Sequence, residues 1–182
     1  MSGAGQDRWV VDPIDGTKSF ICGVPLYATL LSYEVAGEPV IGVCYFPALD
    51  DCIFAEKGQG AFWNGRPSHV SGKSSLKGAV IASSGYLGLT RRGLMEAYVR
   101  MSSEALAART WCDAYGHALV ATGRVDLMID ASVSRWDISA MAIIVREAGG
   151  KFTDLEGHEA LGDNALSSNG WIHEELLGAL RQ

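Results

Sequence analysis

Several features are missing from this sequence, and each absence narrows the class of protein. None of its four cysteines forms a C-x-x-C pair and its four histidines stand far apart, so a zinc site is not expected. No run of about 18 apolar residues occurs, so no transmembrane helix is expected. No apolar signal-peptide core lies near the start, and we therefore expect a cytoplasmic protein with reduced thiols.

Positive charge is also scarce. The 182 residues contain 15 Lys and Arg against 21 Asp and Glu, giving a net charge of -6. Nucleic acids and anionic membranes select basic surfaces, so neither is an expected partner. Hydrophobic residues, at 48%, suffice for a buried core. We expect one domain over residues 1–182 that acts on a small molecule, and the acidic balance is compatible with bound divalent cations.

The hydrophobic pattern changes character midway along the chain. The first half has strand-like segments separated by turn residues, which predict an antiparallel meander. These segments are 9–12, 27–35, 39–46, 51–56 and 60–63, followed by a loop at 66–77. The second half alternates strands with amphipathic helices. Its strands are expected at 79–83, 125–130 and 152–154, and its helices at 91–108, 113–122, 137–148 and 171–180. Together the halves predict layered α and β elements.

One short segment concentrates the chemistry. Asp12 and Asp15 flank Pro13 in the sequence D-P-I-D-G-T, so a stiff turn can bring both carboxylates to one small volume. Carboxylates are ligands that Mg²⁺ prefers. Gly16 and Thr17 follow, where the amides of a beginning helix favour a phosphate group. The alternative is that Asp-Pro and Asp-Gly only form a tight turn.

A second motif lies far downstream. W-D-x-x-A begins at Trp136 and Asp137, and Gly149-Gly150 follows. Taken singly, Asp137 is equally consistent with a helix N-cap and Trp136 with a core aromatic residue. Together and in this order, the two motifs resemble those of the inositol monophosphatase superfamily, and Gly58–Gly65 is similar to its hairpin segment.

The resemblance implies a layered α/β sandwich and Mg²⁺-dependent hydrolysis of a phosphate ester. In that scheme Asp12 bridges two metal ions, Ile14 offers its backbone carbonyl, and Asp15 and Asp137 complete the second metal site. Thr17 orients the attacking water. No covalent intermediate is implied.

Further positions resemble the histidinol-phosphatase branch of this superfamily. These are Lys18–Phe20, Gly23–Tyr27 and Cys112–Gly116. Asp113 would pair with the ammonium group of the substrate, and Asp130 matches a position that contacts substrate with a carboxylate. The alternatives are that Asp113 is a helix N-cap and that Asp130 is a surface acid at a strand end.

The sequence also departs from the family pattern. Full-length relatives carry a segment before D-P-I-D-G-T with a metal-binding Glu-Glu pair, and none of Glu34, Glu38 and Glu56 has that context. The upstream segment is therefore expected to be missing, through truncation or in a short variant. Three functions remain open: a histidinol-phosphate phosphatase, an inositol-1-phosphate or broad sugar-phosphate phosphatase, and a catalytically poor remnant that binds metal or a partner. Uncovered apolar surface favours a homodimer.

Overall fold

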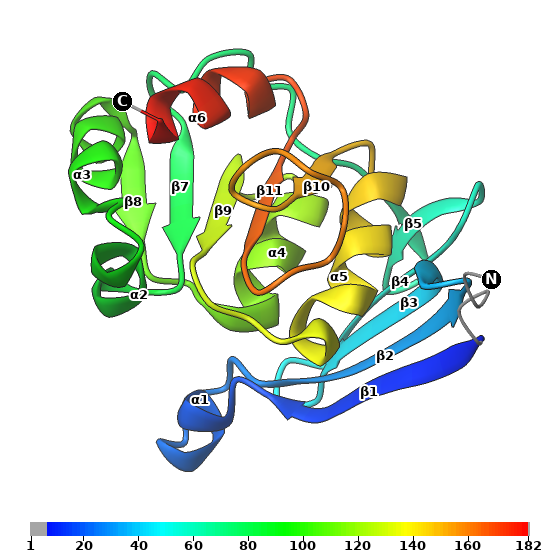
Figure 1. Ribbon diagram of the computed structural model, residues 1–182. Coiled ribbons are helices and arrows are strands. Elements are labelled where there is room, and N and C mark those ends of the chain that lie inside the picture. Colours follow the sequence, from blue (N-terminus) through cyan, green and yellow to red (C-terminus); the bar gives the residue numbers. More distant parts are fainter. Residues whose placement is uncertain (1–6, 182) are drawn as a thin grey trace, which may run out of the picture.

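The computed structural model describes residues 7–181, and its first half forms the expected antiparallel meander (Figure 1). Neighbouring strands in the sequence are neighbours in this six-stranded sheet. The strands are β1 (Arg8–Asp15), β2 (Ala28–Val35), β3 (Glu38–Phe46), β4 (Asp51–Glu56), β5 (Gly60–Trp63) and β6 (Arg66–Ser68). β6 lies where a loop was expected; it is a short edge strand that pairs with β5.

The second half forms a mixed five-stranded sheet. In spatial order its strands are β10 (Lys151–Thr153), β11 (Ala165–Ser168), β9 (Leu127–Asp130), β7 (Val80–Ser83) and β8 (Ala107–Arg109). β9, β7 and β8 run parallel, whereas β10 and β11 pair antiparallel. The sequence pattern did not predict β8 and β11.

Helices make two further layers (Figure 1). α4 (Asp113–Ala121) and α5 (Arg135–Glu147) pack between the sheets, while α2 (Tyr86–Arg91), α3 (Met95–Glu104) and α6 (His173–Leu180) cover the far face of the second sheet. β9 shows how both faces are buried, since Met128 joins the core between the sheets and Leu127 and Ile129 join the outer core. The expected layered α/β fold is thus confirmed.

The single helix expected over 91–108 is wrong. The chain instead forms α2, a turn, α3 and then β8. Gly93, with φ of 72°, lies in the left-handed region and ends the first helix. In residues 7–181, every helix is too short or too polar to span a bilayer.

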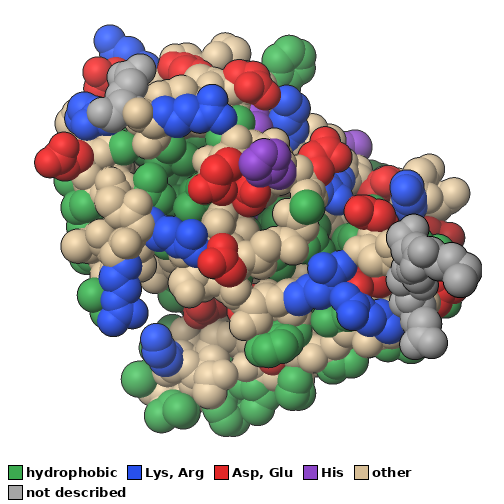
Figure 2. Space-filling view, in the orientation of Figure 1, with side chains coloured by type: hydrophobic (Ala, Val, Ile, Leu, Met, Phe, Trp, Pro, Cys, Tyr) green, Lys and Arg blue, Asp and Glu red, His purple; other side chains and the backbone are tan. Residues whose placement is uncertain are grey.

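The outer face of the first sheet carries exposed apolar side chains near its β1 edge. On β1 they are Trp9, Val11 and Ile14, and on the short helix α1 (Thr17–Ile21) they are Phe20 and Ile21. Figure 2 shows hydrophobic side chains along the lower rim of the molecule, where β1 and α1 lie. This is the apolar surface on which the dimer expectation depends.

Two buried histidines are each expected to make a contribution to stability that is lost in acid. Burial lowers the pKa of His117 to about 3 and of His173 to about 4, from 6.5. Below pH 6.5 both histidines become protonated in the unfolded chain but stay neutral in the folded protein. Their contribution to the free energy of unfolding is therefore present above pH 6.5 and is lost as the pH falls towards the folded pKa. Near pH 4.5 we expect a loss of about 2 to 3 kcal/mol for each histidine. Urea unfolding of the wild type and His173→Gln near pH 7 and pH 4.5 would measure it; an equal pH effect in both proteins would refute the prediction for His173.

Candidate functional site

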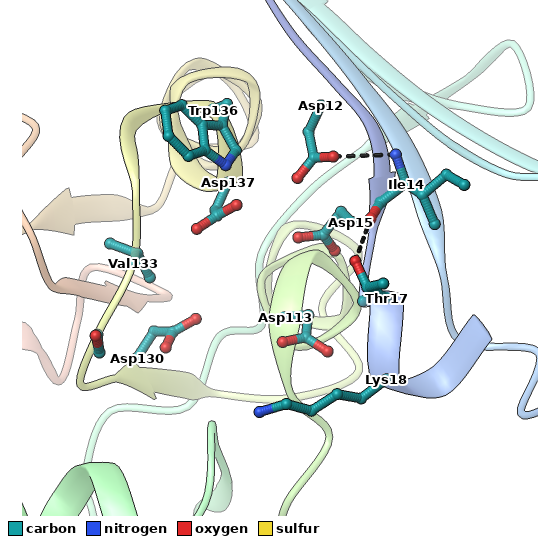
Figure 3. Close-up of a pocket in the computed structure, with 12 residues that line it drawn as sticks. Asp12, Ile14, Asp15, Thr17, Lys18, Asp113, Asp130, Val133, Trp136 and Asp137 are labelled. Atoms are coloured by element: carbon teal, nitrogen blue, oxygen red, sulfur yellow. Dashed lines mark hydrogen bonds between the residues drawn. The ribbon is translucent and has the colours of Figure 1, made fainter. Parts of the chain in front are cut away.

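The D-P-I-D segment forms an irregularity within β1 and not the tight turn that was expected. Asp12 lies opposite Leu30 of β2 and Asp15 lies opposite Ala28, and the register shifts between these pairs. Two residues, Pro13 and Ile14, therefore face a single residue on β2, which is a β-bulge. Proline has no N–H for the strand ladder, so a bulge accommodates it at this edge strand. Both carboxylates point into one cavity (Figure 3).

Hydrogen bonds hold the segment that follows the bulge. The Ile14 amide donates to Asp12 Oδ1 at 3.0 Å, and the Thr17 hydroxyl donates to the Ile14 carbonyl at 3.0 Å. Gly16 has φ of 71°, and a Cβ atom there would lie 2.9 Å from the Leu26 carbonyl oxygen. Only glycine fits this turn without strain. Helix α1 then begins at Thr17, as expected.

Asp137 reaches the same cavity from α5. It is the third residue of the helix and not the N-cap that was considered, because Ser134 occupies that position in a capping box. The Ser134 amide donates to Asp137 Oδ2 at 2.7 Å, which orients the side chain. Buried Glu34 on β2 fixes this end of α5 by accepting hydrogen bonds from Arg135 Nε at 2.8 Å and Ser139 Oγ at 2.7 Å.

Three carboxylates from two distant segments converge. Ligand oxygens of Asp12, Asp15 and Asp137 all lie within 4.8 Å of one another (Figure 3). They line a cavity of about 330 Å³ with Asp113 and Asp130. The remaining lining residues are Ile14, Gly16, Thr17, Lys18, Ser132, Val133 and Trp136. All the predicted site residues thus surround one cavity. Among residues 7–181, no glutamate lines it.

The electrostatics of this cluster suit a cation. Burial is the main cause that raises the pKa of Asp15 to about 8; the nearby Asp113, Asp12 and Asp137 act in the same direction, and a hydrogen bond from the Ala114 amide at 2.9 Å acts against them. Burial also raises the pKa of Asp137, with Asp12 adding to the effect. Crowded, partly desolvated carboxylates resist ionisation unless a positive charge joins them. The all-oxygen donor set fits a hard divalent ion.

The two predicted substrate carboxylates face the other end of the cavity (Figure 3). Asp113 is the first residue of α4, whose N-cap is Cys112, so it does not cap the helix. Its φ of 58° is unusual for a side chain other than glycine. Asp130 ends β9 but is only 5% exposed, so it is not a surface acid, and burial raises its pKa to about 7.

Lys18 is a lining residue to which sequence reasoning gave no role at the site. It is the single cationic side chain among the described residues that line the cavity, and its ammonium group extends below Asp113 (Figure 3). The signal that could have identified Lys18 as a site residue is its position in the first turn of α1, directly after Thr17. Ser132 and Val133 were missed as well, because nothing in their own sequence marks the β9–α5 loop as a cavity wall.

A layered α/β fold that presents a cluster of carboxylates beside a short helix start matches the class that the two motifs predict, the metal-dependent phosphatases. Within that class, the chain belongs to the inositol monophosphatase family, whose model matches residues 2–182. The resemblance of the two motifs is confirmed. The acidic cluster can bind metal, and membership of this family implies a phosphorylated small molecule as substrate.

Relatives with different substrates resemble the chain to similar degrees. The histidinol-phosphatase of Streptomyces coelicolor is 41% identical over all of this chain and 72% of its own length. The inositol-1-monophosphatase of Mesorhizobium japonicum is 37% identical over 97% of this chain and 68% of its own. The structure of an IMPase from Thermotoga maritima superposes with a TM-score of 0.88 at 38% identity, covering 97% of this chain and 69% of that one. The chain thus spans roughly 70% of each relative.

Proposed function

We propose that this protein is a Mg²⁺-dependent phosphomonoesterase whose substrate is histidinol phosphate. The proposal depends on one observation: Asp12, Asp15 and Asp137 meet within 4.8 Å at one end of a cavity, and Asp113 and Asp130 line the same cavity. A substrate with a phosphate at one end and an ammonium group at the other matches this separation of the metal-binding carboxylates from Asp113 and Asp130. Similarity to several histidinol-phosphatases supports this choice.

The position of each residue in the cavity suggests its role. Asp12, Asp15, Asp137 and the Ile14 carbonyl would hold magnesium, which when bound supplies Lewis acidity and lowers the pKa of a water molecule. The Ile14 carbonyl accepts one hydrogen bond from Thr17 and keeps a second lone pair for a cation.

Thr17 is suited to orient the attacking water. Its hydroxyl proton is directed to the Ile14 carbonyl, so its oxygen lone pairs remain free to accept a hydrogen bond from water. The amides of Gly16 and Thr17 at the start of α1 would face the phosphate. Lys18 adds a positive charge below Asp113, at the other end of the cavity.

The test is phosphate release from purified protein with and without Mg²⁺, comparing histidinol phosphate with inositol 1-phosphate. We expect a higher kcat/KM for histidinol phosphate and no release after chelation by EDTA. A preference for inositol 1-phosphate would establish the alternative, an inositol or broad sugar-phosphate phosphatase. No release from either substrate by folded protein would leave a poorly active family member that binds metal or a partner.

Asp113→Asn should alter selectivity without removing hydrolysis. The substitution keeps the shape of the side chain but removes the charge that would pair with the ammonium group. We expect kcat/KM for histidinol phosphate to fall about 30-fold or more, since losing one partner of such a pair costs about 2 kcal/mol or more. Inositol 1-phosphate, which has no ammonium group, should be affected much less. Equal losses for both substrates would show that Asp113 does not select the amine.

We further propose that the protein is a homodimer. The support is the exposed apolar set on β1 and α1, in which Trp9 is 58% exposed and Ile21 is 76% exposed. Light scattering coupled to gel filtration tests this directly. Replacing Trp9 and Ile21 together with serine should shift the mass to that of a monomer if this face forms the contact.

A further inference from the structure

His117 is a buried residue in which one ring nitrogen makes no hydrogen bond with the described residues. Its side chain on α4 is 1% exposed, and its ring lies against Phe152 with centroids 5.2 Å apart. Ring atom Nδ1 lies 2.8 Å from the Ser167 hydroxyl on β11. Nε2 is fully buried and has no hydrogen-bond partner among residues 7–181. Leaving a buried donor or acceptor unpaired costs about 1 to 3 kcal/mol, so an unpaired nitrogen in the core requires an explanation.

The unpaired Nε2 lies behind a residue that forms the cavity wall, on the side away from the cavity. Its neighbour is Asp130, whose Oδ2 lies 3.9 Å away. Asp130 is itself 5% exposed and presents its carboxylate to the cavity. Asp130 on β9 lines the part of the cavity assigned to the ammonium group, and His117 on α4 lies behind it.

The contact with Ser167 is compatible with either tautomer of the ring, and one of the two makes Nε2 a donor. Burial keeps the imidazole neutral, so only one of its nitrogens carries a proton. If the Ser167 hydroxyl donates to Nδ1, the proton resides on Nε2 and points at Asp130. An ionised carboxylate can then accept this N–H on Oδ2 and keep its other oxygen for a cationic ligand.

We propose that His117 is a positioning residue for substrate recognition, holding the Asp130 carboxylate towards the ammonium group through an Nε2–H that Ser167 fixes. This inference rests on the proposed function, because it assigns the amine-recognising end of that site. His117 does not touch substrate. This role requires the carboxylate to turn when the cation binds, so that the 3.9 Å separation from Nε2 closes to hydrogen-bonding distance.

The kinetic test compares His117→Met with the matched control His173→Met. His173 is a second buried histidine, bonded to Ser168 and Thr153 and absent from the cavity lining. The substrates are histidinol phosphate and glycerol 2-phosphate, which lacks an ammonium group. For His117→Met the ratio of the two kcat/KM values should fall about tenfold, mainly through KM for histidinol phosphate, as expected for about 1.4 kcal/mol. His173→Met should leave the ratio unchanged. An unchanged ratio in His117→Met would overturn the proposal.

A double-mutant cycle shows whether His117 acts through Asp130. In an Asp130→Asn background, the His117→Met effect on the ratio should disappear. If it persists in full, His117 acts by another route and the proposal is wrong.

A spectroscopic experiment distinguishes a failure of this inference from a failure of the proposed function. Long-range ¹H–¹⁵N correlation spectra of the labelled protein report the tautomer of each histidine without any turnover. We expect the Nε2–H form for His117 and a shift of that nitrogen in Asp130→Asn. An Nδ1–H form, or no shift, would overturn the inference even in a protein that hydrolyses neither substrate. Absent hydrolysis with the expected spectrum would count against the proposed function alone.

Discussion

Asp15→Asn should abolish phosphate release while leaving the metal-free protein at least as stable as the wild type. Asp15 is the most buried member of the carboxylate cluster, and its oxygens belong to the proposed metal site. Losing a ligand that supports several kcal/mol of Lewis-acid stabilisation should lower kcat/KM by roughly 10³-fold. The amide oxygen of asparagine can still accept the Ala114 hydrogen bond, so the local backbone is retained.

The same carboxyl group makes metal binding depend on pH. Its pKa of about 8 in the metal-free protein means that it is largely protonated near pH 7, and a cation must displace that proton. Magnesium affinity should therefore rise as the pH increases through about 8, with proton release measurable by calorimetry in buffers of different ionisation enthalpy. Asp15→Asn should remove most of this proton release.

The stability of the metal-free protein should follow the opposite trend. A carboxyl group whose folded pKa is raised from 3.8 binds more protons in the folded state, so its contribution is lost as the pH rises through about 8. Asp15→Asn should flatten that decline. Asp50→Asn is the matched control, because Asp50 is exposed and, within residues 7–181, its side chain bonds only Tyr45. Full activity in Asp15→Asn would refute the metal assignment.

The sequence pattern predicted the fold best where elements were long. The strands of the meander and helix α5 follow periodicities of two and 3.6 residues and appear within a few residues of the expected limits. The strands that it missed are β6, β8 and β11, with three or four residues each, which are too short to establish a period. Their positions depend on partners far away in the chain, such as Leu127 opposite Ser168.

The site, too, could be predicted from the sequence only in part. The closeness of Asp12 and Asp15 follows from local spacing, although the bulge that produces it does not. The meeting of these residues with Asp137 crosses from β1 to α5, and no local rule could predict it; only the resemblance of two motifs linked them. The burial of Asp130 was also hidden, because the layers that enclose the end of β9 come from α4 and β11.

Gly42→Ala should damage the site from a distance. Gly42 lies on β3 beneath α5, and an added Cβ atom would lie 2.5 Å from both the Ala140 carbonyl oxygen and Ile143 Cγ2. Backbone of α5 must move, and α5 carries Asp137. We expect a loss of about 3 kcal/mol in unfolding free energy from overpacking. A displacement of about 1 Å at Asp137 should lower kcat by about 10²-fold.

The control for that variant is Gly178→Ala in α6, where an added Cβ meets nothing within 4 Å. It should be neutral or slightly stabilising, because alanine favours a helix over glycine. Thermal unfolding and magnesium titration of both variants separate the two consequences of moving α5. Weaker magnesium binding in folded Gly42→Ala is expected, because α5 sets the distance from Asp137 to Asp12 and Asp15. Unchanged affinity together with lowered stability would show that the cluster tolerates the shift, and that close packing at Gly42 serves the core alone.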